Sequence, residues 1–171
     1  MKMKEKLLKK IENKEIEVGV VGLGYVGLPL AVEKAKAGFK TIGFDVQSEK
    51  VDLVNKGHNY IGDVVDSDLK KLVEAGMLKA TTNFSFVKEV DFIAICVPTP
   101  LEKHQQPDIS YVKSSTEEIA KYLTRETIVV LESTTYPGTT EELVKTILEK
   151  GSGLKCGVDF YLGFSPERVD P

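Results

Sequence analysis

Three closely spaced glycines near the N-terminus form a pattern that could bind phosphate groups. They lie in the run Gly22-Leu23-Gly24-Tyr25-Val26-Gly27. Residues 16–21 before this run are mostly apolar, as in a buried strand, and residues 28–35 after it have the pattern of a helix. Such a unit needs one glycine for the turn, a second where phosphate approaches the backbone, and a third where helix and strand pack closely. The N–H groups and the dipole at the helix start favour an anion, so the run predicts a pyrophosphate site.

An acidic residue, Asp45, follows the next apolar run at residues 41–44. A carboxylate at this place can accept hydrogen bonds from both hydroxyls of an adenosine ribose, and it repels a 2′-phosphate. The pattern therefore favours NAD over NADP. The alternative is that the three glycines are only turn residues. This interpretation does not explain why a strand, a helix and an acidic residue all occur in the order that the nucleotide-binding motif requires. An ATP phosphate loop, G-x-x-x-x-G-K-[ST], does not occur in the chain.

Lys50 falls in the first turn of the next predicted helix, near where an adenosine would end. It is either a neighbour of the adenine or ribose, or an ordinary solvated lysine. Three later polar clusters also follow predicted strands. They are Val97-Pro98-Thr99-Pro100, Glu132-Ser133-Thr134 and Ser165-Pro166-Glu167-Arg168.

Six apolar runs alternate with helical patterns along the chain. Strands are expected at residues 16–21, 41–44, 78–83, 91–97, 127–131 and 160–164, and helices at 28–35, 48–55, 67–76, 109–122 and 141–148. This alternation predicts an α/β fold with a doubly wound, parallel, six-stranded Rossmann sheet. Right-handed crossovers then favour the strand order 3-2-1-4-5-6, which brings all the polar clusters to one edge.

Composition restricts the class of protein. The chain has 171 residues, 42% of them hydrophobic, which suits one compact domain. A net charge of −3 does not indicate a nucleic-acid surface. Cys96 and Cys156 lie far apart without neighbouring histidines, so neither a disulfide nor a metal site is expected. Without a signal peptide or an apolar stretch of roughly 18 residues, we expect a cytoplasmic protein that binds neither membrane nor nucleic acid.

Residues 1–15 are rich in lysine and carry apolar side chains at helical spacing. They predict an extra amphipathic helix ahead of the sheet. A basic amphipathic helix could lie on a membrane. The segment is short and has few apolar anchors, so packing on its own domain or on a partner is the favoured interpretation.

The clusters together resemble a known family, the nucleotide-sugar 6-dehydrogenases, which include UDP-glucose and UDP-N-acetylhexosamine dehydrogenases. The resemblance begins near residue 16 and continues to the C-terminus. The matching motifs are Gly22-Leu23-Gly24-Tyr25-Val26-Gly27-Leu28-Pro29, Val97-Pro98-Thr99-Pro100, Glu132-Ser133-Thr134 with Pro137-Gly138-Thr139-Thr140 as one motif, and Ser165-Pro166-Glu167-Arg168. Four motifs in the same order are far more specific than one glycine turn.

The resemblance implies oxidation of a sugar's primary alcohol to a carboxylate in two NAD-dependent steps, through a thioester on a cysteine. It implies cofactor contacts by the glycine run, Asp45, Val97, Pro98, Thr99 and Thr134. It also implies that Arg168 meets a phosphate of the cofactor or of the substrate. Thr134 would also position a catalytic water or proton. Glu167 would act near the reacting sugar carbon, a general-base task that suits a carboxylate.

The family's nucleophilic cysteine belongs to a downstream glycine-rich motif that this sequence lacks. The central helix and the C-terminal UDP-binding domain of the family are also absent from this sequence. We therefore expect an N-terminal helix at residues 1–15, an NAD-binding domain at 16–171, and no activity from this chain alone. The full-length protein is expected to be a homo-oligomer that acts on a UDP-sugar. The loop at residues 98–108 resembles the N-acetylhexosamine branch of the family more than the glucose branch, which implies a UDP-N-acetylhexosamine as substrate.

Two other functions remain open from the sequence. A stand-alone NAD-binding or regulatory module would suit the short chain and the lysine-rich N-terminus. A 2-hydroxy acid dehydrogenase would share the fold, but it needs a catalytic histidine, and His58 and His104 lie in predicted loops without an evident orienting acid.

Overall fold

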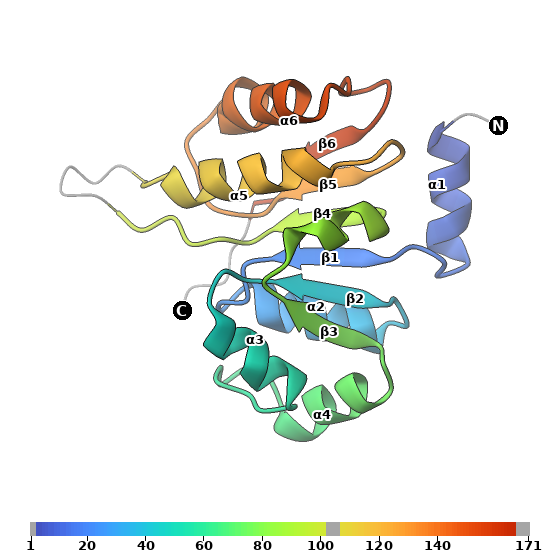
Figure 1. The fold of residues 1–171 in the computed structure, drawn as a ribbon, viewed down its shortest axis with the longest axis vertical. Coiled ribbons are helices and arrows are strands. Elements are labelled where there is room, and N and C mark those ends of the chain that lie inside the picture. The colour runs from blue at the N-terminus through green and yellow to red at the C-terminus, as the bar shows by residue number, and fades with distance from the viewer. Residues whose placement is uncertain (1–2, 102–106, 167–171) are drawn as a thin grey trace.

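A parallel sheet with helices on both faces forms the centre of the molecule (Figure 1). The computed structural model describes residues 3–101 and 107–166. The strands are β1 (Val18–Val21), β2 (Thr41–Phe44), β3 (Leu78–Thr81), β4 (Phe92–Ile95), β5 (Ile128–Leu131) and β6 (Tyr161–Phe164). The α-helices are α1 (Met3–Glu12), α2 (Gly27–Lys36), α3 (Ser48–Asn55), α4 (Asp66–Glu74), α5 (Ser110–Tyr122) and α6 (Lys145–Ser152).

The strand order is β3-β2-β1-β4-β5-β6, as the sequence predicts. Every neighbouring pair is parallel, and β1 lies between β2 and β4, with Val18 opposite both Thr41 and Phe92. The chain runs to one side from β1 to β3 and then to the other side from β4 to β6. The carboxyl end of β1 is therefore the point at which the strand order reverses, where open α/β sheets bind ligands.

Two apolar clusters cover the two faces of the sheet. One contains Val18 and Val20 of β1 together with buried residues of α2, α3 and α4. The other contains Val21 of β1 together with buried residues of α5 and α6. Successive side chains of a strand point to opposite faces, so a strand buried on both faces must be apolar throughout. This explains the continuous apolar runs in the sequence.

The observed elements differ from the predicted ones in two connections. A 3₁₀-helix, η1 (Phe84–Glu89), joins β3 to β4, where the sequence pattern predicts none. The side chain of Asn83 caps η1 by accepting a hydrogen bond from the N–H of Ser85. Before α6 the chain forms a π-helical turn, η2 (Thr139–Val144), so the regular helix begins later than expected. Both elements are short, and short segments carry too few periodic positions for a pattern to identify.

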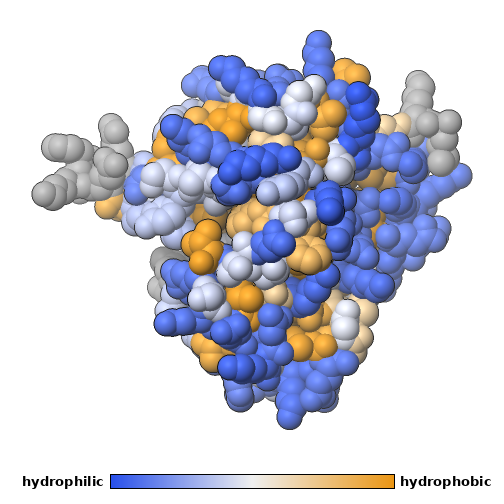
Figure 2. Space-filling model, in the orientation of Figure 1, coloured by the Kyte–Doolittle hydropathy of each residue, from blue (hydrophilic) through white to orange (hydrophobic). Residues whose placement is uncertain are grey.

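Helix α1 packs on its own domain, at the edge of the sheet where the strands begin (Figure 1). Leu7 is only 3% exposed, and Ile11 packs against the apolar cluster that contains Val18. This confirms the packed helix that the sequence favours. Apolar and hydrophilic residues are interspersed over the face that Figure 2 shows. Within residues 3–101 and 107–166, no helix is long and apolar enough to span a membrane.

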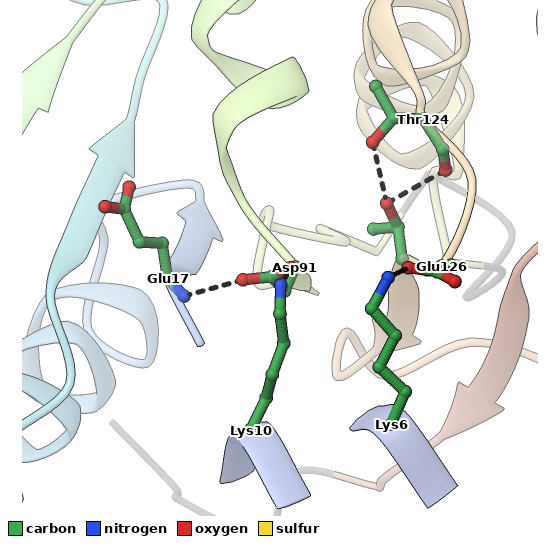
Figure 3. A network of polar contacts seen from close by, with 7 residues as sticks. Lys6, Lys10, Glu17, Asp91, Thr124 and Glu126 are labelled. Carbon is green, nitrogen blue, oxygen red and sulfur yellow. Dashed lines mark hydrogen bonds and ion pairs between the residues drawn. The ribbon is translucent and has the colours of Figure 1, made fainter. Parts of the chain in front are cut away.

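Lysines of α1 form ion pairs with the segments that enter β4 and β5 (Figure 3). Lys10 Nζ lies 2.6 Å from Asp91 Oδ1, and Asp91 Oδ2 accepts a hydrogen bond of 3.0 Å from the N–H of Glu17. Lys6 pairs with Glu126 in the same way. One carboxylate therefore joins α1, the entry to β1 and the entry to β4.

Removal of this carboxylate should destabilise the domain. We expect Asp91→Ala to lower the free energy of unfolding by about 1–3 kcal/mol, because the Glu17 N–H and Lys10 both lose their partner. Lys10→Ala should cost less, about 0.5–1 kcal/mol, because its ion pair is partly exposed. Urea denaturation measures both effects. Lys4→Ala, on the exposed side of α1, is the control, and a loss for Asp91→Ala no larger than for Lys4→Ala would contradict this role.

Candidate functional site

The glycine turn at residues 22–27 joins β1 to α2 and permits a very close contact between them. A Cβ atom on Gly27 would lie 1.7 Å from the carbonyl oxygen of Gly22, which no side chain can tolerate. Gly22 has φ of +92°, and a Cβ atom there would lie 2.7 Å from the carbonyl oxygen of Cys96. The first and third glycines are therefore required by the turn and by packing.

The middle glycine of the turn has a different environment. A Cβ atom on Gly24 would meet no protein atom within 4 Å, so this side of the backbone is open. At the start of α2 the N–H of Leu28 donates to the carbonyl oxygen of Gly24, the N–H of Leu30 donates to that of Val26, and Pro29 has no N–H. The helix dipole makes this end attractive to an anion. An open backbone surface beside a helix N-terminus fits a phosphate group.

Asp45 lies at the carboxyl end of β2 and is 8% exposed. Its Oδ2 accepts a hydrogen bond of 2.8 Å from the N–H of Leu23, and its Oδ1 accepts one of 2.9 Å from the N–H of Gln47. The carboxylate is thus fixed against the glycine turn. Each carboxylate oxygen can accept more than one hydrogen bond, so capacity remains for the hydroxyls of a ribose.

Tyr60 also contacts the glycine turn, although the sequence analysis does not identify it. Its hydroxyl donates a hydrogen bond of 2.7 Å to the carbonyl oxygen of Leu23. Burial, together with the negative charge of Asp45, raises the pKa of the Tyr60 hydroxyl well above its ordinary value. The hydroxyl therefore stays protonated and remains a donor. The only sign of this contact in the sequence is an aromatic residue in a loop that has a glycine on either side.

The carboxyl ends of β4 and β5 meet beside the glycine turn. The Ser133 hydroxyl lies 2.7 Å from the carbonyl oxygen of Val97, to which it donates a hydrogen bond. Val97 is partly buried, and a Cβ atom on Gly22 would lie 3.1 Å from its Cα. The serine therefore fixes the start of the segment that contains Pro98 and Thr99. Ser133 belongs to the motif Glu132-Ser133-Thr134, in which the sequence predicts a role only for Thr134.

Thr134 follows Ser133 and is exposed at this edge. Ser165, after β6, donates a backbone hydrogen bond of 3.0 Å to the carbonyl oxygen of Leu131, so the last strand ends at the same edge. Glu167 and Arg168 lie outside the described residues. Among the described ranges the strand-end clusters are thus brought to one edge of the sheet.

The cysteines and Lys50 complete the set of candidates. Cys96 is 6% exposed, and its Cβ would be 3.3 Å from a Cβ atom on Gly27, so its surroundings are those of a packed core residue. Cys156 lies after α6. It forms an isolated β-bridge with Phe160, the residue directly before β6. Lys50 is partly exposed in the first turn of α3, which follows Asp45 and Gln47.

Comparisons with known proteins match nearly the whole chain. Residues 16–171 match the model of the UDP-glucose/GDP-mannose dehydrogenase family, NAD binding domain. The chain is 44% identical to Protein CapL of Staphylococcus aureus, over 90% of this chain and 35% of that protein. It is 42% identical to a UDP-N-acetyl-D-glucosamine 6-dehydrogenase of Pseudomonas aeruginosa, over 92% of this chain and 36% of that enzyme. The chain thus spans little more than a third of these relatives.

A solved structure shares both the fold and the sequence. The NDP-N-acetyl-D-galactosaminuronic acid dehydrogenase of Methanosarcina mazei Go1 superposes with a TM-score of 0.87 at 38% identity, over 99% of this chain and 38% of that one. The agreement of family model, relatives and structure leads to one conclusion. The chain belongs to the UDP-glucose/GDP-mannose dehydrogenase family and contains its NAD-binding domain.

Proposed function

We propose that this domain holds NAD for a longer enzyme that oxidises the C6 alcohol of a UDP-N-acetylhexosamine to a carboxylate in two steps. The observation that carries the proposal is the environment of Gly24. It is open on the side where a side chain would be, while Gly22 and Gly27 on either side of it are tightly packed. Relatives named for UDP-N-acetylhexosamine substrates support this substrate class.

Each part of the cofactor has a proposed contact. The pyrophosphate lies against the backbone at Gly24, Tyr25 and Val26, and the adenosine ribose binds to Asp45. Lys50 lies on the adenosine side. The nicotinamide end contacts Val97, Pro98, Thr99 and Thr134, which follow β4 and β5. Arg168 is proposed to contact a phosphate of the cofactor or the substrate. This contact is proposed from the resemblance alone.

The residues of this chain hold and orient the reactants. When bound, NAD supplies an acceptor for the hydride that leaves the alcohol carbon. Ser133 holds the backbone at Val97 and so orients the segment that carries Thr99. Thr134, exposed beside it, positions a water or a proton, and Glu167 acts as general base near the sugar. Cys96 is buried in the core, and Cys156 lies in the segment before β6, at the edge opposite the strand ends, so the nucleophilic cysteine is proposed to lie outside this chain.

The fragment should bind NAD without catalysing the reaction. We expect purified protein of residues 1–171 to produce no NADH from NAD with UDP-N-acetylglucosamine or UDP-N-acetylmannosamine, because the chain lacks the cysteine motif of the resemblance. Absorbance at the NADH band measures turnover, and calorimetry on the same preparation confirms that NAD binds. Sustained NADH production would contradict the proposed location of the nucleophile.

Substitution of the middle glycine, Gly24, should weaken NAD binding and leave the stability of the domain nearly unchanged. Gly24→Ala should change the free energy of unfolding by less than about 1 kcal/mol, because its Cβ meets nothing. It should weaken NAD binding at least about tenfold, because the methyl group occupies the path of the phosphate. Gly27→Ala is the matched control and should lower stability by more than about 3 kcal/mol. If Gly24→Ala binds NAD as tightly as wild type, the phosphate position is wrong.

Asp45 should determine the choice of cofactor. The wild-type domain should bind NAD more tightly than NADP, since the carboxylate repels a 2′-phosphate. Asp45→Asn should weaken NAD binding roughly tenfold or more. It should also reduce the difference in affinity between NAD and NADP. Asp52→Asn, on the exposed side of α3, is the control and should behave as wild type. Calorimetric titration provides the affinities, and equal wild-type affinity for NAD and NADP would refute the ribose contact.

A further inference from the structure

Tyr60 belongs to the loop between α3 and α4, outside the glycine turn and outside the strand-end clusters. Its hydroxyl nevertheless reaches the turn and lies 2.7 Å from the carbonyl oxygen of Leu23. The two residues are 37 positions apart in the chain. A hydrogen bond to a partly buried backbone carbonyl holds that peptide group in place. If the bond breaks, the carbonyl oxygen does not readily find another donor, so breaking the bond costs free energy.

Leu23 is held at three points. Its N–H donates to Asp45, its carbonyl oxygen accepts from Tyr60, and its side chain is fully buried. The side chain packs on Gly43 of β2, where a Cβ atom would lie 2.7 Å from Leu23 Cδ2. The residue between the first two glycines of the turn therefore has little freedom to move.

Two consecutive peptide planes are fixed by these contacts. Asp45 fixes the Gly22–Leu23 plane through the N–H of Leu23, and Tyr60 fixes the Leu23–Gly24 plane through the carbonyl oxygen of Leu23. All peptide bonds of the described residues are trans, so the N–H of Gly24 points away from the Tyr60 hydroxyl. A hydrogen bond to the carbonyl also polarises the peptide and makes the opposite N–H a stronger donor.

The loop that carries Tyr60 is itself well anchored. The side chain of Asn59 donates to the carbonyl oxygens of Ile61 and Val64 and accepts a hydrogen bond of 2.8 Å from the N–H of Ile61. The N–H of Asn59 donates to Asp66 Oδ1 at 3.1 Å. Ile61 and Val64 are buried, with 4% and 5% of their surface exposed. Tyr60 therefore approaches the turn from a fixed backbone.

We propose that Tyr60 is a positioning residue for NAD, acting through the Leu23 peptide. It does not contact the cofactor. It holds the Leu23–Gly24 peptide in the orientation that receives the pyrophosphate, while Asp45 on the other side of the same residue receives the ribose. This inference rests on the proposed site for NAD at the glycine turn.

The test is the removal of one hydroxyl group. Tyr60→Phe keeps the ring and loses only the bond to Leu23, so NAD affinity measured by calorimetry should fall roughly 3- to 10-fold. Tyr122→Phe, at the last residue of α5, is the matched control and should bind NAD as wild type does. Equal affinity of Tyr60→Phe and wild type would overturn the proposal. A wild-type domain that does not bind NAD would instead refute the proposed function.

Amide hydrogen exchange without cofactor tests the same inference independently. Followed by NMR, the N–H of Leu23 should exchange at least several-fold faster in Tyr60→Phe than in wild type, because loss of the Tyr60 bond loosens the turn. The N–H of Val20 in β1 should keep its rate, which shows that the fold is intact. If the Leu23 rate does not change, positioning through Leu23 is refuted even where NAD affinity falls. In a domain that fails to bind NAD, this measurement shows only whether Tyr60 orders the turn.

Discussion

The contact between Gly27 and the carbonyl oxygen of Gly22 is the constraint on which the rest of the structure depends. With no Cβ at Gly27, the first turn of α2 packs directly on the end of β1. β1 is the central strand, paired with both β2 and β4, so the position of α2 is fixed relative to the point where the strand order reverses. The start of the helix, the positive end of its dipole, then faces the edge where the other strands end.

Around this contact, backbone groups rather than side chains are the main targets of the polar residues. Asp45 accepts from the N–H groups of Leu23 and Gln47, Tyr60 donates to the carbonyl oxygen of Leu23, and Ser133 donates to that of Val97. These bonds hold the loops in place before any ligand arrives. A site whose loops are already ordered loses less conformational entropy on binding, which favours affinity.

The two edges of the sheet have different roles. At the amino edge, lysine ion pairs join α1 to the entries of β4 and β5, and Ile11 packs against the apolar cluster that contains Val18. These contacts contribute to stability. At the carboxyl edge the same strands end in the glycine turn, the segment after β4 and the segment after β5. Parallel strands impose this separation, because all of them begin at one edge and end at the other.

Much of this protein could be derived from its sequence. Apolar runs alternating with helical patterns determine a parallel sheet, and right-handed crossovers then determine its order, because both depend on local periodicity and chain handedness. The glycine spacing and Asp45 predict the cofactor site for the same local reason. The roles of Tyr60 and Ser133 were decided only by the tertiary structure, as were the pairs between α1 and Asp91 or Glu126. Each of these contacts joins residues that are distant in the chain. Those of Tyr60 and Ser133 are made to a backbone carbonyl oxygen, which every residue possesses and no sequence pattern marks.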